Sequence, residues 1–434
     1  MSGKSFNSSV VPESGCLKSM EDTRVVITGL GTINAVARNA DEFAAALQQG
    51  RCGIGPVTVF DAAPFRTHTG GEVKAFDPKR EVPQAFYGKR MSRSDAMAML
   101  AALEALEDAG LFPLPEDLHQ DTGVAIGGGA GGMPDGEAAY ERCLAGQADA
   151  VRFSDFSAFC CASSADHIVS KLRLWGPKTT FMTACSSGAT ALGYARDLIR
   201  DGMARIMIAG GTEPLARTTY AAFNSLKAVD PEFCKPFDGT REGMSLGEGA
   251  GMMILESLDH ARARGARIYG EIRGYGISCD ADHMTAPDPE ASGAVRCMQM
   301  ALADAGVSPD DVDYINAHGT ATPANDRMET IGIKRVFGEK AFRIPVSSTK
   351  SMIGHTLGAA GAIEAVACVL ALSRGFIPPT IHSRTRDPEC DLDYVTEGAR
   401  RATLDVILSN SFAFGGNNTS VVLGSFREEG SANG

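Results

Sequence analysis

The stretch Lys178-Thr179-Thr180-Phe181-Met182-Thr183-Ala184-Cys185-Ser186-Ser187-Gly188 decides how the chain is interpreted. Its first five residues are largely β-branched or aromatic and predict a strand, whereas Ala189–Arg200 predicts a helix. Cys185 therefore lies at a strand-to-helix junction, where free backbone N–H groups and the helix dipole favour a thiolate. A reactive nucleophile and a buried cysteine in a tight turn both fit this position.

Composition bounds the class of protein. The chain has 434 residues, 44% of them hydrophobic and 22% charged, which suits a globular protein of two or three domain-sized units. Its net charge of −12 argues against nucleic acid as the main partner. No window resembles a signal peptide, and the 11 cysteines form no CxxC pair. We therefore predict a cytoplasmic protein without a metal site.

The order of elements predicts an α/β fold. Residues 1–23 and 426–434 are interpreted as a flexible leader and tail, and residues 24–265 and 266–425 as two halves. Alternating strands and helices predict a mainly parallel sheet with helices on both faces. The apolar run Thr356–Leu372 contains Glu364 and predicts a buried helix, not a membrane span. The predicted strands are Arg24–Gly29, Thr122–Ile126, Lys178–Met182, Arg205–Gly211, Ala250–Glu256, Ile268–Tyr275, Asp313–Ala317, Ile344–Ser348, Val406–Ser411 and Thr419–Leu423. The predicted helices are Asp41–Gln49, Met91–Gly110, Ala189–Arg200, Ser292–Gly306, Asp326–Phe337 and His355–Arg374.

The two halves repeat the same order of elements. Cys185 and His355 each follow a predicted strand and each begin a predicted helix, so we predict a structural duplication with two similar cores back to back. The glycine run Gly127–Gly132 also follows a strand. No GxxxxGK[ST] motif accompanies it, so close backbone packing is favoured over phosphate binding.

Three later stretches carry reactive side chains. His318 lies in Asn316–Pro323, Lys350 and His355 lie in one short segment, and Asn410–Asn418 is a glycine turn between strands. Strand ends gather at one edge of a parallel sheet, so these turns can meet Cys185. One nucleophile and two imidazoles suit acyl transfer: the thiolate takes the acyl group, and neutral imidazoles donate to the enolate oxygen of a second substrate. We interpret the other histidines as surface or packing residues: His68, His119, His167, His260, His283 and His382.

Four motifs in this order resemble a known family. They are TACSSG (183–188), NAHGTATP (316–323), KSMIGHTLGAAGAIEA (350–365) and FGGNN (414–418). Over about residues 24–424 the chain resembles the β-ketoacyl-acyl carrier protein synthases of the elongating, type II kind. The resemblance implies a duplicated thiolase-like fold with five layers, α/β/α/β/α.

The resemblance also implies a role for each motif residue. Cys185 matches the acylated nucleophile. His318 and His355 match the pair that assists decarboxylation, with Lys350 and Glu364 as its supporting charges. Phe414 matches the gating residue whose N–H joins that of Cys185 in the oxyanion hole. Thr320 and Thr322 match the threonines that bind the phosphopantetheine arm, which enters as part of the substrate while no cofactor stays bound. Thr285, Phe223, Phe412 and Ala130 are further predicted substrate contacts.

The pairing of Glu364 with Lys350 is also expected on physical grounds. The neighbours of Glu364 in the predicted helix are apolar, so burying its carboxylate is costly unless a partner such as Lys350 is present. A cation at Lys350 would keep His355 neutral. The alternative is that Glu364 lies on an exposed helix face.

Some residues depart from the family pattern. AFGGNN (413–418) replaces the usual GFGGTN, so the opening of this loop is expected to differ. Ala130 replaces a bulky residue at the end of the acyl pocket, which suggests a longer or bulkier primer.

The expected partners are an acyl carrier protein and a second subunit. No carrier segment follows residue 424, so we expect the carrier to be a separate, acidic protein. Lys89, Arg90 and Lys227 match basic docking positions and Arg152 is a fourth candidate, although ordinary solvated charge explains them equally well. The second subunit is expected to be an identical chain or a related ketosynthase.

The predicted function is decarboxylative Claisen condensation of an acyl group on Cys185 with malonyl-acyl carrier protein, in fatty acid or polyketide-type synthesis. One alternative is a catalytically idle subunit of a heterodimeric ketosynthase, and another is a thioester hydrolase. The intact Cys185, His318 and His355 argue against the first alternative, and the hydrolase leaves one histidine and Lys350 unexplained. Degradative thiolases carry a second cysteine in the last glycine turn, which here holds Phe412 and Phe414.

Overall fold

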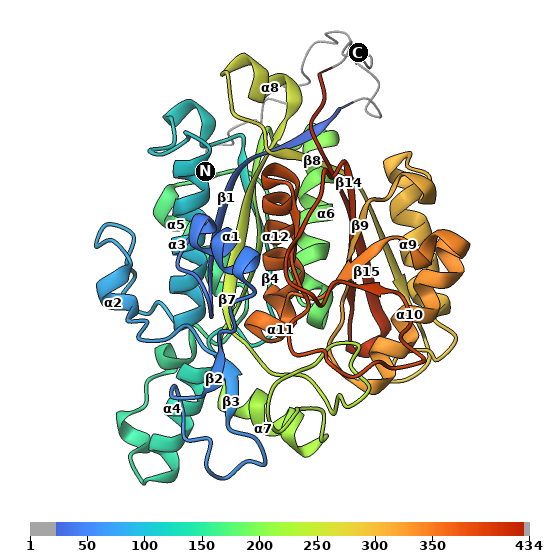
Figure 1. The fold of residues 1–434 in the computed structure, drawn as a ribbon. Coiled ribbons are helices and arrows are strands. Elements are labelled where there is room, and N and C mark those ends of the chain that lie inside the picture. The colour runs from blue at the N-terminus through green and yellow to red at the C-terminus, as the bar shows by residue number, and fades with distance from the viewer. Residues whose placement is uncertain (1–22, 429–434) are drawn as a thin grey trace.

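The protein is built in five layers around two buried helices. The computed structural model describes residues 23–428, so nearly all of the predicted leader and most of the predicted tail lie outside the described residues. Figure 1 shows α6 (Ser187–Arg200) and α12 (Ala360–Arg374) between two groups of strands, with other helices on the outer faces. Three apolar clusters fill the spaces between these layers. The predicted five-layer architecture is thus observed.

The strands form one sheet of 11 strands, in the order β12-β10-β9-β14-β15-β8-β1-β7-β6-β4-β5. Within this sheet the two halves are joined where β1 pairs with β8, at Val26 with Glu271 and Ile27 with Gly270. The sheet has five parallel pairings and five antiparallel pairings. The prediction of a mainly parallel sheet was therefore wrong, because the four central strands β15, β8, β1 and β7 each run antiparallel to both of their neighbours.

The strand order reveals the duplication. Reading inward from each end, β5-β4-β6-β7-β1 corresponds to β10-β9-β14-β15-β8, with β12 added at one edge. Because β5 corresponds to β10, the segment that holds Cys185 corresponds to the segment that holds Lys350 and His355. The boundary between residues 265 and 266 stays a prediction. The strands are β1 (Val25–Asn34), β2 (Ile54–Pro56), β3 (Thr69–Gly71), β4 (Thr122–Gly127), β5 (Lys178–Phe181), β6 (Ile206–Glu213), β7 (Gly249–Ser257), β8 (Gly270–Cys279), β9 (Tyr314–Asn316), β10 (Pro345–Ser347), β11 (Phe376–Ile377), β12 (Asp393–Tyr394), β13 (Arg400–Arg401), β14 (Val406–Phe412) and β15 (Asn417–Gly424).

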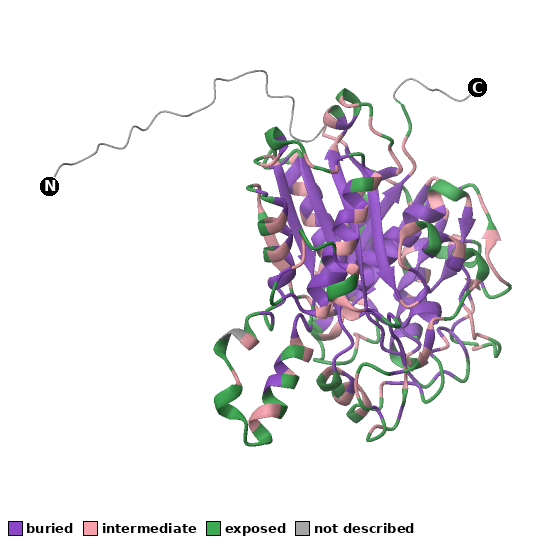
Figure 2. Ribbon diagram, turned by 90° about the vertical axis from the view of Figure 1, so that its left-hand side faces the viewer, coloured by how far each residue is buried: buried purple, intermediate pink, exposed green. Residues whose placement is uncertain are grey.

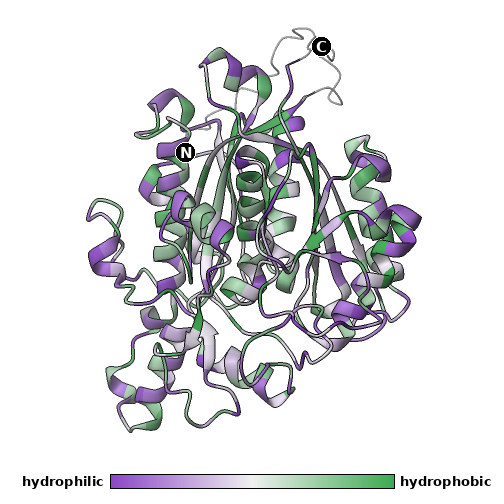
Figure 3. Cartoon of the chain, viewed as in Figure 1, coloured by the Kyte–Doolittle hydropathy of each residue, from purple (hydrophilic) through white to green (hydrophobic). Residues whose placement is uncertain are grey.

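The central helix α12 is strongly apolar along its length (Figure 3). In α12 every residue from Ala360 to Ala371 is buried. Leu357–Arg374 is the one segment of the described chain that is long and apolar enough to cross a membrane, but 78% of it is buried inside the protein. This agrees with the prediction of a core helix. The helices are α1 (Ala40–Gln49), α2 (Pro78–Glu81), α3 (Arg93–Asp108), α4 (Met133–Leu144), α5 (Ser163–Leu172), α6, α7 (Arg217–Ser225), α8 (Leu258–Ala263), α9 (Ser292–Ala305), α10 (Pro323–Phe337), α11 (Lys350–Ile353) and α12.

Exposure is concentrated at the periphery, as Figure 2 shows. The segment around α4 projects below the body in Figure 1 and carries exposed apolar side chains at Tyr140, Leu144 and Phe153. In the core, one predicted boundary was wrong. His355 does not begin a helix, because a short helix, α11, precedes it and a turn separates it from α12.

Candidate active site

Cys185 lies where the sequence predicts, between β5 and α6, in a short 3₁₀ turn (Ala184–Ser186). Ala184 adopts a left-handed φ of 51°, a conformation that costs a non-glycine residue about 1–3 kcal/mol. A Cβ on Gly127 would come within 2.3 Å of the backbone of Gly188, so a glycine is needed there for this close approach. The turn thus fixes the sulfur at a tight junction.

The charge state of Cys185 differs from the prediction. The residue is buried, and burial raises the pKa of its thiol to about 12, although Lys350 and the backbone N–H of Phe414 act in the opposite direction. Desolvation of the charge thus opposes the effect of the helix terminus and favours the neutral thiol.

His355 is the nearest partner of that sulfur. Its Nε2 lies 3.1 Å from Sγ of Cys185. Its Nδ1 accepts a hydrogen bond of 3.2 Å from the N–H of Leu357. A neutral imidazole carries one proton, so that proton is on Nε2 and points toward Cys185. Burial and the charge of Lys350 lower the pKa of His355 well below its ordinary value.

His318 completes the group from the end of β9. Its ring centroid lies 5.2 Å from that of His355, with 82° between the ring planes. Burial, Lys350 and His355 lower its pKa well below its ordinary value, so both imidazoles are neutral, as predicted. The carboxylate of Glu329 accepts the N–H groups of His318 and Gly319, at 2.8 Å each, and holds this turn.

Lys350 and Glu364 form an ion pair in which both side chains are 1% exposed. The alternative of an exposed face for Glu364 is therefore excluded. Burial raises the pKa of Glu364 to about 6, against the effect of Lys350. The pair lies close enough to lower the pKa of both imidazoles through the Lys350 charge.

The loop after β14 covers the sulfur. The backbone N–H of Phe414 bonds to the Cys185 thiol, and the Phe414 ring stacks on Phe223 with centroids 5.6 Å apart. The loop is tied to the segment after β8, since Gly415 donates to the carbonyl of Met284 at 2.8 Å. Asn417, where the family pattern has threonine, donates from Nδ2 to the Phe414 carbonyl at 3.3 Å.

A cavity of about 310 Å³ opens onto Cys185, His318 and His355. Most of the predicted substrate contacts line it, and so does one predicted docking residue, Lys227. The predicted residues in its wall are Phe223, Lys227, Thr285, Thr320, Thr322, Phe412 and Phe414. The site is therefore a pocket that opens to the surface beside Lys227, with a thiol and two neutral imidazoles in its wall.

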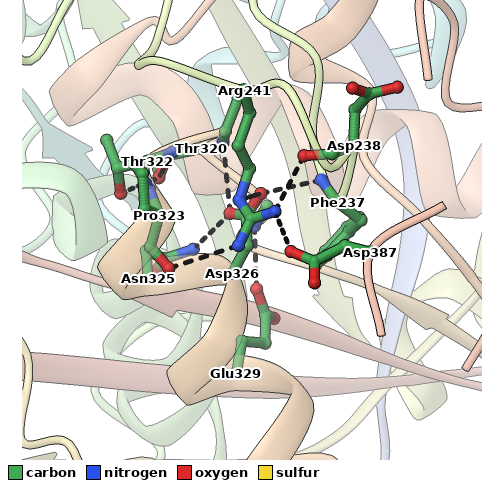
Figure 4. A network of polar contacts seen from close by, with 12 residues as sticks. Phe237, Asp238, Arg241, Thr320, Thr322, Pro323, Asn325, Asp326, Glu329 and Asp387 are labelled. Atoms are coloured by element: carbon green, nitrogen blue, oxygen red, sulfur yellow. Dashed lines mark hydrogen bonds and ion pairs between the residues drawn. The ribbon is translucent and has the colours of Figure 1, made fainter. Parts of the chain in front are cut away.

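Beneath the threonine turn lies a buried polar network that sequence reasoning missed (Figure 4). Arg241 pairs with Asp326 and Asp387 and donates to the carbonyl of Asp238. Asp326 in turn accepts the N–H of Ala321, the residue between Thr320 and Thr322, at 3.1 Å. No motif in the sequence marks these positions, because their partners lie far along the chain.

Other predicted residues lie outside this cavity. Ala130 is buried, with its N–H bonded to Glu213, and does not line the cavity. Lys89 and Arg90 line a second cavity of about 560 Å³ beside α4. Arg152 is exposed next to it, with its N–H 3.1 Å from Asp155, which lines that cavity. The predicted docking residues thus fall into two groups.

Most of the remaining histidines have local partners, among them His119 with the Leu114 carbonyl and His382 with Cys52. His260 pairs with Glu256 at 2.6 Å, and His167 lies 3.7 Å from Asp95. Nδ1 of His283 accepts the N–H groups of Thr285 and Ala286, so His283 supports the turn at the cavity.

A metal ion has one candidate position among residues 23–428. The ligand atoms of Cys185, His318 and His355 lie within 4.8 Å of one another. Thiolate and imidazole are donors that suit Zn²⁺. The predicted absence of a metal site stays a prediction.

A buried thiol in a strained turn, two neutral imidazoles and an adjacent N–H donor define a cysteine-dependent acyl-transferring enzyme. Comparison with known proteins agrees. A family model described as "Beta-ketoacyl synthase, N-terminal domain" matches residues 22–261, and one described as "Beta-ketoacyl synthase, C-terminal domain" matches residues 269–384. The chain belongs to the β-ketoacyl synthase family.

Curated relatives cover nearly the whole chain. The 3-oxoacyl-[acyl-carrier-protein] synthase 2 of Synechocystis sp. is 44% identical over 414 residues, which cover 93% of this chain and 99% of that protein. The synthase of the same name from Coxiella burnetii is 44% identical over 416 residues, with the same coverage.

Solved structures agree in fold. A chain of "The ishigamide ketosynthase/chain length factor" superposes with a TM-score of 0.87 at 40% identity, covering 93% of this chain and 100% of that chain. A chain from the structure of a type II polyketide synthase acyl-carrier protein in complex with its ketosynthase superposes with a TM-score of 0.84 at 34% identity, with the same coverage. The predicted thiolase-like ketosynthase fold is confirmed.

Proposed function

We propose that the protein catalyses decarboxylative condensation of an acyl group on Cys185 with malonyl-acyl carrier protein, giving a β-ketoacyl-carrier and CO₂. One observation carries this proposal: a thiol and two neutral imidazoles share one cavity. We extend the proposal to a place in fatty acid or polyketide-type synthesis. We also propose a carrier protein and a ketosynthase-like subunit as partners, because the names of related structures include an acyl-carrier protein and a chain length factor. Ten unpaired cysteines among the described residues support a cytoplasmic location.

The first step is acyl transfer. Sγ of Cys185 attacks the thioester carbon of the acyl-carrier, and the bond to the carrier sulfur breaks. The thiol proton of Cys185 ends on the departing carrier thiol, so no other reactant is consumed. The N–H groups of Cys185 and Phe414 hold the oxygen of the tetrahedral intermediate, and loss of one such donor costs about 10²- to 10³-fold in rate.

The second step forms the carbon–carbon bond. The malonyl group loses CO₂, and the resulting enolate oxygen accepts hydrogen bonds from the imidazoles of His318 and His355. The enolate carbon attacks the Cys185 thioester, the bond from carbon to Sγ breaks, and the sulfur takes up one proton from solvent. Imidazolium rings would also donate, but neutral rings do so without adding buried charge.

The substrate arm and its carrier have separate contacts. We infer that the hydroxyls of Thr320 and Thr322, which lie 2.9 Å apart, bind the phosphopantetheine arm, with Thr285 at the same cavity. Lys227 at this cavity and the group formed by Lys89, Arg90 and Arg152 are proposed to dock the acidic carrier. Ala130 does not line this cavity, and we propose that its small side chain leaves room for a longer primer beyond the cavity wall.

The test is release of labelled CO₂ from malonyl-carrier after the enzyme has been loaded with an acyl group. We expect mass spectrometry to find the acyl group on Cys185, and release to require that acylation. A Cys185→Ala variant should form no β-ketoacyl product. Hydrolysis of the acyl-carrier without CO₂ release would favour a hydrolase, and an unacylated Cys185 would favour an idle subunit.

A further inference from the structure

A buried carboxylate stands at the end of β6 with no assigned role. Glu213 is 0% exposed, and within residues 23–428 it forms no ion pair with a cation. Its oxygens accept the N–H groups of Gly129, Ala130 and Gly358, at 2.8, 2.6 and 2.9 Å. Burying an unpaired carboxylate is costly, and these three donors are its compensation.

The Gly358 contact reaches the turn that orients His355. Leu357 precedes Gly358 and adopts a left-handed φ of 45°, which is strained for a leucine. The N–H of that same Leu357 donates to Nδ1 of His355. The bond from Gly358 to Glu213 therefore fastens the strained turn at the residue that follows Leu357.

Little space is left around the Glu213 carboxylate, which explains the glycines at positions 129 and 358. A Cβ on Gly358 would lie 2.6 Å from Oε2 of Glu213 and from the backbone of Gly128, and a Cβ on Gly129 would lie 3.1 Å from Oε2. Within the glycine run after β4, Gly129 borders this carboxylate, and Gly132 closely approaches the backbone of Ala158 instead. These close approaches agree with the packing interpretation of the run.

We propose that Glu213 is a positioning residue for His355: by holding Gly358 it keeps the Leu357 N–H on Nδ1, which fixes the imidazole proton on Nε2, toward Cys185. This inference rests on the proposed condensation, in which Nε2–H donates to the enolate oxygen. Without the carboxylate, the Leu357 turn relaxes and the ring gains access to the tautomer that carries its proton on Nδ1. That tautomer presents a lone pair to the enolate and cannot stabilise it.

The experiment compares Glu213→Gln with the wild type. In ¹⁵N-histidine-labelled protein, the wild-type His355 signal should report a protonated Nε2 and an unprotonated Nδ1, with a His355→Asn variant assigning the signal. In Glu213→Gln we expect a mixture of tautomers. The kcat for malonyl decarboxylation should fall about 10- to 100-fold while KM changes less than about twofold.

A rescue variant separates positioning from folding. Glycine adopts a positive φ without strain, so Leu357→Gly in the Glu213→Gln background should restore the Nε2–H tautomer and most of kcat. The control is Glu256→Gln, which removes another fully buried carboxylate, at the far end of β7, where it pairs with Arg264. It should lower stability and leave the His355 tautomer unchanged.

Two results would overturn the proposal. One is an unchanged His355 tautomer in folded Glu213→Gln protein, and the other is a rescue variant that regains stability without regaining the tautomer. Since the tautomer is read without substrate, it tests this inference even if the wild type releases no CO₂, a result that would refute only the proposed condensation. A proton on Nδ1 of His355 in the wild type would overturn the proposal as well, because it contradicts the Leu357 contact on which the proposal rests.

Discussion

Burial sets the charge of each reactive side chain in this site. His318 and His355 both have pKa values well below 6.5, because desolvation and the charge of Lys350 disfavour a second cation. We expect an NMR titration of the wild type to find both rings neutral at pH 6.5, where an ordinary imidazole is about half protonated. They should gain a proton only as the pH falls further. Half-protonation of either ring near that pH would contradict this assignment.

The buried pair of Lys350 and Glu364 gives a prediction about stability. Glu364→Gln leaves an uncompensated ammonium group at a site that is 1% exposed. We expect the free energy of unfolding in urea to fall by about 3–5 kcal/mol. The double variant Lys350→Met, Glu364→Leu removes both charges and should recover most of that loss. A single variant as stable as the wild type would show that the pair is not the charged, closed contact described above.

At the residue scale, the sequence predicts which residues form the site better than it predicts whether their side chains are protonated. Cys185, His318, His355, Lys350 and Glu364 were all found from motifs, and the structure brings them together. The charge of the thiol was predicted wrongly, because the sequence shows the helix terminus but not the depth of burial. Glu213, Glu329 and Arg241 were missed because their partners are backbone groups or residues far along the chain.

At the scale of elements, the loop between β14 and β15 lies over the sulfur, with Phe414 in the wall of the cavity. Within this loop the Asn417 side chain donates to the Phe414 carbonyl, and we expect this bond to restrain the loop. Asn417→Thr should loosen the loop, and because one hydrogen bond is worth about 1 kcal/mol, alkylation of Cys185 by iodoacetamide should accelerate about fivefold. Peptide mass spectrometry measures the rate at Cys185 separately from the exposed Cys52, which serves as an internal control. Equal rates in the two proteins would show that Asn417 does not hold the loop.

Element positions were predicted closely where periodicity is strong. The predicted helix Asp41–Gln49 is observed as Ala40–Gln49, with Gly50 at its left-handed cap. Strand direction was harder, since composition does not tell a reversed strand from its neighbours. The turn at His355 was taken for helix because its residues are small and apolar, whereas a left-handed Leu357 ends the regular pattern there.

At the scale of the molecule, β5 is the last strand of the sheet, and its outer edge has no partner strand among residues 23–428. Met182 directly follows this strand, and its side chain is 64% exposed. An exposed edge strand with an apolar neighbour is a natural site for pairing with a second subunit. We expect Met182→Arg to weaken self-association, measured by analytical ultracentrifugation. An unchanged sedimentation coefficient would place the subunit contact elsewhere.

The architecture as a whole was predicted from motifs more than from composition. Duplication was inferred from two segments that each follow a strand and carry a reactive residue, and the strand order agrees. The two separate groups of basic residues were not foreseeable, because they are set by how the segment around α4 projects from the body.

The correspondence between β5 and β10 has a consequence for how such a site arises. Two copies of one polypeptide, assembled as a symmetric pair, must present the same side chain at both equivalent turns. In a single chain the two turns are free to differ, and here one holds Cys185 while the other holds Lys350 and His355. The difference between the two turns, on which the chemistry depends, is thus possible because both halves belong to one chain.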